Sequence, residues 1–143
     1  MTHTWKVIQI FITLCGGAIG GFLGGLDGFM YTLIAFIVID YIMGFMCAIV
    51  DKKLSSEVGF RGIFKKICIL FLVGVANMID VNVIGQGAVL RTAVIFFYLS
   101  NEGVSILENA GRLGLPIPQK LRDVLAQLKD EDDKPEEENG DGE

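Results

Sequence analysis

The feature that most constrains the fold is a run of twenty residues without a charge, Val7 to Leu26. At a rise of about 1.5 Å per residue, a helix of this length covers the roughly 30 Å hydrocarbon core of a bilayer. After the turn signal Asp27-Gly28, residues 29–50 form a second apolar run that carries one charge, Asp40. The two runs predict membrane-spanning helices packed as a tight hairpin. A cleaved secretory signal peptide is the alternative interpretation of the first run, but no small-residue cleavage site follows it.

The overall composition agrees with a membrane environment, although the net charge is misleading. Hydrophobic residues make up 52% of the 143-residue chain and the mean hydropathy is +0.53, which favours a bilayer over a soluble domain. The net charge of −5 arises in residues 130–143, which hold nine acidic residues and one lysine. The remaining residues, 1–129, hold eleven basic and eight acidic side chains, so the membrane part is mildly basic.

The segment between residues 51 and 66 predicts the orientation of the chain. It contains five basic and two acidic residues; the basic ones are Lys52, Lys53, Arg61, Lys65 and Lys66. The positive-inside rule therefore predicts that this loop is cytoplasmic, and the preceding hairpin returns the N-terminus to the same side. Residues 63–79 can span the bilayer if Lys65 and Lys66 extend toward the inner interface. Residues 88–107 can span it if the helix tolerates Arg91 and further polar residues.

We therefore predict an all-α integral membrane protein with three to four transmembrane helices, at residues 7–26, 29–50, 63–79 and 88–107. In the three-span alternative, one of the two weaker helices lies at the membrane interface. Residues 1–112 would form the transmembrane domain. Residues 113–129 would form a short amphipathic helix at the cytoplasmic face or membrane surface, and residues 130–143 would form a disordered acidic tail.

The sequence contains no pattern typical of an enzyme, a metal site or a cofactor site. The three cysteines lie inside apolar runs without CxxC spacing, which indicates small buried hydrophobes. The one histidine, His3, lies in a terminal segment, and no phosphate-binding glycine loop follows a strand. We expect no catalytic, cofactor-binding or metal-binding residue and no nucleic-acid partner; the expected partners are membrane lipid and further copies of the chain.

A glycine-rich stretch in the first run predicts close helix packing. GGAIGGFLGG contains two ladders of glycines spaced four residues apart, and together these are Gly16, Gly17, Gly20, Gly21, Gly24 and Gly25. Helices in lipid associate where small residues let their backbones approach closely. The ladders could pack against the second helix of the same chain or against a second copy, and the pattern does not distinguish these partners.

Asp40 needs a compensating interaction, because an acid near the bilayer centre costs roughly 2.5 to 3.5 kcal/mol on insertion scales. The candidates are an ion pair with Arg91, a protonated carboxyl sharing a hydrogen bond with a neighbouring helix, or water in a pore. A proton relay would need further titratable groups at depth, so a structural or pore role is the better interpretation.

The fourth apolar segment carries polar residues along one side. Projected at about 100° per residue, Arg91, Tyr98, Glu102, Ser105, Asn109 and Arg112 fall within an arc of roughly 80°, and Asn101 is a further polar residue of this segment. A solvated helix at the membrane interface would show the same pattern, and periodicity alone favours it. A water-filled hole also requires a helix with such a stripe, and no other segment of the sequence has one.

Three motifs carry a resemblance to a known family. They are Asp40-Tyr41 with Gly44, the loop from Leu54-Ser55-Ser56 through Gly59-Phe60-Arg61-Gly62 to Lys65-Lys66, and Asn101-Glu102 through Ser105, Glu108-Asn109, Gly114 and Pro118. In these motifs the sequence resembles phage holins of the toxin-secretion/phage-lysis type, which include small clostridial holin-like proteins linked to toxin release.

The resemblance implies a non-enzymatic protein that oligomerises in the bacterial cytoplasmic membrane of a host cell. It also implies that the oligomer forms holes which release an endolysin or a toxin. Cytoplasmic termini are predicted separately, because four spans with both ends inside satisfy the charge asymmetry. The alternative is an antiholin or adaptor, a regulatory membrane protein that binds a holin without forming holes. A toxin and an endolysin would pass by the same physics, so both remain possible cargoes.

Overall fold

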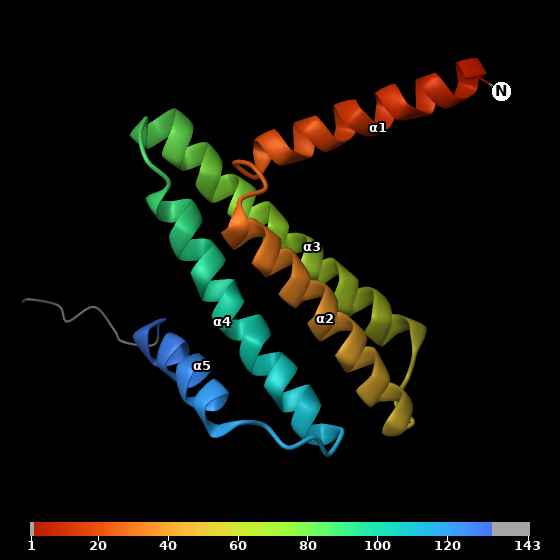
Figure 1. Ribbon diagram of the computed structural model, residues 1–143, viewed down its shortest axis with the longest axis vertical. Helices are drawn as coiled ribbons and strands as arrows, with labels where there is room; N and C mark the ends of the chain where they lie inside the picture. The colour runs from red at the N-terminus through yellow and green to blue at the C-terminus, as the bar shows by residue number, and fades with distance from the viewer. Residues whose placement is uncertain (1, 133–143) are drawn as a thin grey trace, which may run out of the picture.

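The computed structural model describes residues 2–132, and within these residues every regular element is helical. The prediction of an all-α chain is therefore confirmed. In chain order the elements are α1 (Thr2–Phe22), α2 (Gly28–Val50), α3 (Ser56–Ile79), the π-helix η1 (Asp80–Ile84), α4 (Val89–Arg112) and α5 (Gln119–Asp132). Figure 1 shows α2, α3 and α4 side by side as a bundle, with α1 extending away from its upper end.

The core lies where α2, α3 and α4 meet. The buried apolar residues in this cluster include Met30, Leu33 and Ile37 from α2, Ile69 and Val73 from α3, and Ile95 and Leu99 from α4. On each helix these residues recur three or four positions apart, so they form one face that turns toward the other two helices.

Short polar side chains determine where α2 and α3 begin. The side chain of Asp27 accepts a hydrogen bond from the backbone N–H of Met30, and Ser55 does the same for Val58. Each satisfies a donor that has no partner within the first turn of the helix. Asp27 of the predicted Asp27-Gly28 turn is therefore the N-cap of α2. Because Ser55 begins α3 in the same way, the loop between α2 and α3 contains only a few residues.

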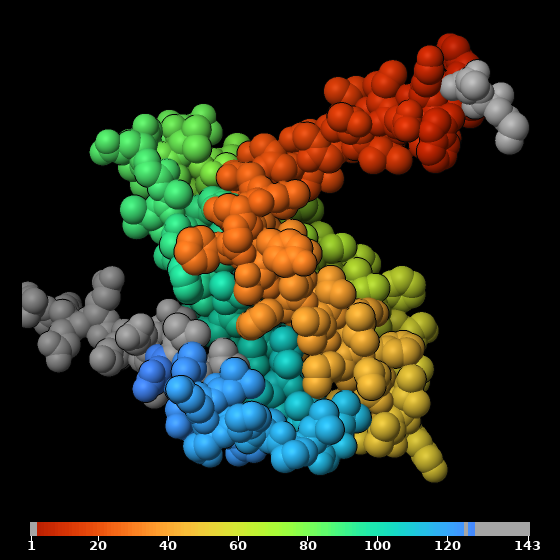
Figure 2. Space-filling view, viewed as in Figure 1, coloured from red at the N-terminus to blue at the C-terminus, as the bar shows by residue number. Residues whose placement is uncertain are grey.

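The predicted hairpin of the first two helices is wrong. Among the described residues, α1 contacts α3 and not α2. The contact lies at the C-terminal end of α1, where the ring of Phe22 occupies the space that a Cβ at Gly74 would need, and Asn77 donates a hydrogen bond to the Phe22 carbonyl at 3.2 Å. Figure 2 shows the rest of α1 projecting from the body of the molecule.

Only four of the six glycines in the two predicted ladders lie on α1. The helix ends at Phe22, so Gly24 and Gly25 lie in the turn before α2 and not on a helix face. Both have positive φ, +81° and +95°, which glycine adopts without the steric cost that a Cβ would bring. This left-handed turn directs α1 away from α2, which is the physical reason that the two helices do not form a hairpin.

In the part of the chain that the structure describes, three helical segments are long and apolar enough to cross a membrane: His3–Phe22, Gly28–Val50 and Ser56–Ile84. The chain is a multi-pass membrane protein. The third segment begins earlier than the predicted residue 63, because Ser55 caps the helix there. α4 is not among the three, although it packs against two of them along the bundle.

The C-terminal helix α5 lies beside α4, as Figures 1 and 2 both show. Helical structure continues through residues 130–132, which were predicted to belong to the disordered tail. The remainder of the predicted tail, residues 133–143, lies outside the described residues.

Candidate functional site: a buried polar seam and its groove

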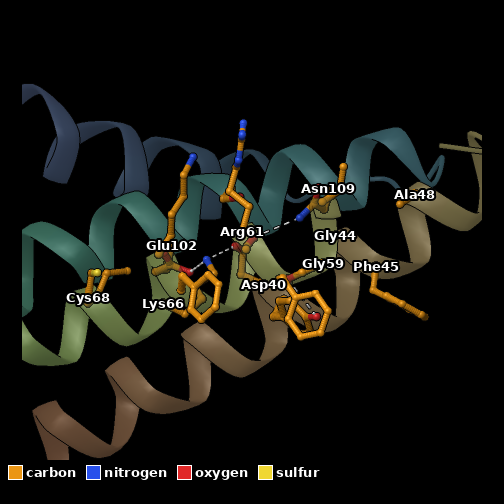
Figure 3. A pocket seen from close by; sticks show the side chains of 18 of the residues that line it. Asp40, Gly44, Phe45, Ala48, Gly59, Arg61, Lys66, Cys68, Glu102 and Asn109 are labelled. Atoms are coloured by element: carbon orange, nitrogen blue, oxygen red, sulfur yellow. Dashed lines mark hydrogen bonds and ion pairs between the residues drawn. The ribbon is translucent and has the colours of Figure 1, made fainter. Parts of the chain in front are cut away.

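A single lysine on α3 joins acids on the other two bundle helices. The Nζ of Lys66 lies 2.5 Å from Oδ2 of Asp40 on α2 and also forms an ion pair with Glu102 on α4. The three side chains are 19%, 9% and 8% exposed, respectively. Figure 3 shows the two carboxylates converging on the ammonium group. Lys66 therefore connects all three helices at one level of the bundle.

Asn109 extends this cluster toward the α2–α3 loop. Its amide Nδ2 donates a hydrogen bond of 3.1 Å to Oδ1 of Asp40, and its backbone carbonyl accepts one from Sγ of Cys47 at 3.4 Å. We call Asp40, Lys66, Glu102 and Asn109 the polar seam. Among residues 2–132, every buried side-chain nitrogen or oxygen has a hydrogen-bond partner.

The polar seam supplies the compensating interaction that the sequence requires for Asp40. Its partners are Lys66 and Asn109, whereas Arg91 lies elsewhere, so the candidate ion pair between Asp40 and Arg91 is wrong. Lys66 was expected to extend toward the inner interface and instead turns into the bundle. A charge without a partner at this depth would be costly, and the ion pairs offset that cost.

Arg91 fastens the turn between α1 and α2 at the other end of the bundle. It donates hydrogen bonds to the carbonyl oxygens of Leu23 at 2.6 Å and Gly25 at 2.9 Å, and it forms an ion pair with Asp27 at 2.7 Å. A Cβ at Gly24 would lie only 2.6 Å from Nε of Arg91, so a larger residue would displace the guanidinium. We call this set of contacts the Arg91 clasp.

Asp80 holds Arg91 in place from η1. Its buried carboxylate accepts hydrogen bonds from the backbone N–H groups of Leu90 and Arg91, at 3.1 Å and 2.8 Å. It thereby satisfies donors in the first turn of α4, where Ala88 provides no side-chain cap. Asp80 lies between the predicted spans 63–79 and 88–107, and the structure assigns it this capping contact.

A groove of about 1500 Å³ opens beside the seam, between α3 and the pair α2 and α4. Figure 3 shows it from close by. Most of the predicted polar stripe lines this groove: Tyr98, Asn101, Glu102, Ser105, Asn109 and Arg112. Arg91, the first residue of the stripe, is separate from it and belongs to the clasp. The stripe of α4 therefore faces the interior of its own bundle.

The other predicted motif residues lie around the same groove. Asp40, Tyr41 and Gly44 line it from α2, and Arg61, Lys65 and Lys66 line it from α3. The Tyr41 hydroxyl donates a hydrogen bond of 3.5 Å to the Gly59 carbonyl. Lys52 and Lys53 are exposed in the loop and do not line the groove.

Arg112 closes the loop end of the bundle by an ion pair with Asp51, which follows α2. The hydrogen bond to Asp51 raises the pKa of the Arg112 guanidinium above its usual value. Sequence reasoning placed Arg112 on the stripe but missed this partner. It also missed the bridging role of Lys66. The sequence pattern that could have indicated this role is a lysine on an otherwise apolar helix face, together with one acid on each of two neighbouring helices.

Comparison with known proteins identifies the family. The chain matches the bacteriophage holin family over residues 17–130, a range that includes the seam, the clasp and the groove. The chain belongs to this family. The family resemblance inferred from the three sequence motifs is therefore confirmed.

Several relatives share most of their length with this holin-family chain. The chain is 46% identical to the uncharacterized protein Lmo0128 of Listeria monocytogenes, over 84% of this chain and 86% of the relative. It is 44% identical to the uncharacterized 14.9 kDa protein in the nagH 3′ region of Clostridium perfringens, over 73% and 80% of the two chains. It is 33% identical to the uncharacterized protein YtkC of Bacillus subtilis, over 83% and 88%. No solved structure matches the chain.

We predict that Lys66→Met destabilises the bundle by about 3–5 kcal/mol, because it leaves two buried carboxylates without their cation. The triple variant Asp40→Asn, Lys66→Met, Glu102→Gln should recover most of this loss. The free energy of unfolding in mild detergent, measured by titration with SDS, provides the comparison. Lys53→Met, which removes an exposed lysine, is the control. Equal stability of Lys66→Met and the control would contradict the bridging role.

The Arg91 clasp predicts a dependence on acid that involves Asp27, which lies outside the spanning segments. The hydrogen bond from Arg91, followed by that from the Met30 N–H, lowers the pKa of Asp27 from its ordinary value of 3.8. A lowered folded-state pKa adds stability that is present above the ordinary value and is lost as the pH falls through the folded value. The difference in thermal stability between the wild type and Asp27→Asn should therefore shrink below about pH 3.8. A difference that stays constant between pH 6 and pH 3 would exclude this contribution.

Proposed function

We propose that the chain is a holin: copies assemble side by side in the cytoplasmic membrane of a bacterium and open holes. An endolysin, or a secreted toxin, would leave through these holes, and the chain itself would catalyse no reaction. The observation that carries the proposal is the family match over residues 17–130, because it covers the whole bundle and not one isolated helix.

The exposed helix α1 supplies a surface for assembly. Its described residues pack against the bundle only near the C-terminal end, and nothing lies within 4 Å of a Cβ placed on Gly16, Gly17, Gly20 or Gly21. In lipid, small residues of this spacing allow the backbone of another helix to approach closely. Among the described residues α1 does not contact α2, which supports lateral contact between copies as the partner of this face.

The polar seam supplies the surface for a hole. In one subunit Glu102 and Asn109 of α4 are paired with Lys66 on α3 and Asp40 on α2. When subunits crowd together, exchange of these contacts for contacts with water would place Asn101, Glu102 and Ser105 along an aqueous opening. Because water would replace the protein partners of Glu102 and Asn109, these two groups would keep a hydrogen-bond partner throughout the exchange.

The proposed topology has four crossings. α4 runs back along α2 and α3, and its buried charged residues Arg91 and Glu102 are paired with Asp27 and Lys66, so it can cross the bilayer despite these charges. The α2–α3 loop and the end of α4 then lie on one side, joined by the pair of Arg112 and Asp51. The basic residues of that loop make this side cytoplasmic, and both termini would lie there.

Expression of the chain alone in a bacterium tests the proposal. A holin should cause abrupt loss of membrane potential and should release a co-expressed endolysin. The inward orientation of the stripe favours one alternative, a regulator that binds a holin and opens nothing. Cells that keep their membrane potential while the protein accumulates in the membrane would support that alternative and overturn the holin proposal.

We predict that Gly16→Leu with Gly20→Leu delays or abolishes lysis, because two bulky side chains prevent close approach of another α1. Ala18→Leu, a change on the opposite side of the same helix, is the matched control and should leave lysis timing unchanged. Cross-linking in membranes should show fewer oligomers for the glycine variant alone. Normal cross-linking and timing in the glycine variant would contradict assembly through this face. Gly24→Leu is unsuitable for the test, because it would disturb the Arg91 clasp.

A further inference from the structure

We infer that the groove beside the seam binds an anionic phospholipid, with the lipid phosphate against Arg61 and Lys65 and an acyl chain along α3. This site goes beyond hole formation, because lipid binding needs only the folded subunit in a bilayer. The inference rests on three properties of the groove: the exposed positive charge of Arg61 and Lys65, its apolar wall, and the order of the two along α3.

The groove contains four basic residues, and two of them are already neutralised. Lys66 is held by Asp40 and Glu102, and Arg112 is held by Asp51. Arg61 approaches Glu57 at 3.8 Å, and both of those side chains are largely exposed. Arg61 has only this long, exposed ion pair and Lys65 has no acidic partner among the described side chains, so both offer positive charge beside the groove.

The wall next to this charge is apolar. Phe64, Cys68 and Leu72 line the groove from α3, and Phe45 lines it from α2. Phe64 is 62% exposed, so its ring is accessible to an acyl chain in the groove. A groove of about 1500 Å³ is at or above the size of sites that enclose small molecules, and an acyl chain can occupy such a space.

The order of these residues along α3 matches the order of groups in a lipid. Arg61 and Lys65 are four residues apart and lie within the first turns of the helix, near the basic loop. Phe64, Cys68 and Leu72 repeat at the same spacing on an adjacent stripe and continue toward the middle of the membrane. The phosphate would therefore lie at the interface and the chain would lie in the hydrocarbon core. Basic pockets between transmembrane helices at the cytoplasmic side bind anionic headgroups for this reason.

Quenching of a tryptophan in the groove by brominated lipid tests the inference on the full-length chain. Trp5, the one tryptophan of the chain, is replaced by Phe, and Phe64→Trp places the probe in the groove. Bilayers of phosphatidylcholine then receive brominated phosphatidylglycerol or brominated phosphatidylcholine at equal mole fractions. We expect brominated phosphatidylglycerol to quench the probe more strongly than brominated phosphatidylcholine. Arg61 and Lys65 should each raise the relative affinity of the groove for phosphatidylglycerol by about fivefold.

Two double variants locate the preference. Arg61→Gln with Lys65→Gln should reduce it to nearly one. Lys120→Gln with Arg122→Gln removes the same charge from α5, outside the groove, and should preserve it. Equal affinity for the two lipids in the unchanged groove would overturn the inference. An equal loss of preference in both double variants would also overturn it, because general attraction to the surface would then explain the binding.

Two further outcomes would assign the groove to another occupant. A preference that grows when residues 133–143 are deleted would assign Arg61 and Lys65 to the acidic residues of the chain itself. If neither brominated lipid quenches the probe, and quenching appears only at a low protein-to-lipid ratio, a second copy of the chain occupies the groove. Either result would overturn the inference, whereas a preference unchanged by deletion and by dilution supports it.

Discussion

The structure depends on one ammonium group placed between two carboxylates in a region where water is scarce. Lys66, Asp40 and Glu102 lie on three different helices, and each would be costly in a bilayer if it had no partner. The contact therefore determines which faces of α2, α3 and α4 turn toward one another, since a helix rotated away from this arrangement would expose a charge to lipid. Such an ion pair adds little net stability compared with a well-packed apolar core, but breaking it is expensive.

The molecule has two parts, the bundle of α2, α3 and α4 and the projecting helix α1. α4 lacks the hydropathy of a spanning helix, yet it belongs to the bundle because Glu102 and Asn109 find partners on α3 and α2. α1 is apolar and carries open glycines, yet it packs against the bundle only near Phe22. The Arg91 clasp joins the two parts at the turn. The bundle thus pairs its buried charges internally, whereas α1 leaves most of its surface without a contact in the described chain.

The sequence was sufficient to predict the helical class, the membrane environment and the family, because each depends on local composition or on motifs close together in the chain. It also predicted that Glu102 and Asn109 share a helix face. It could not predict that Lys66 turns inward, because a lysine near a basic loop is equally suited to reaching the interface. The hairpin of the first two helices was predicted incorrectly for a related reason: the direction of α1 is determined by the positive φ of Gly24 and Gly25 and by Arg91, which is more than sixty residues away in the chain.

The central claim is that one lysine contacts two carboxylates on neighbouring helices, and a spectroscopic distance measurement in liposomes tests it most directly. With ¹⁵N in the lysine side chains and ¹³C in the aspartate and glutamate carboxyl groups, solid-state NMR reports short-range coupling between the two nuclei. The account predicts that the Lys66 signal couples to two carboxyl carbons, that Asp40→Asn removes one coupling, and that Glu102→Gln removes the other. A Lys66 signal that couples to no carboxyl carbon, or that is unaffected by both substitutions, would contradict it.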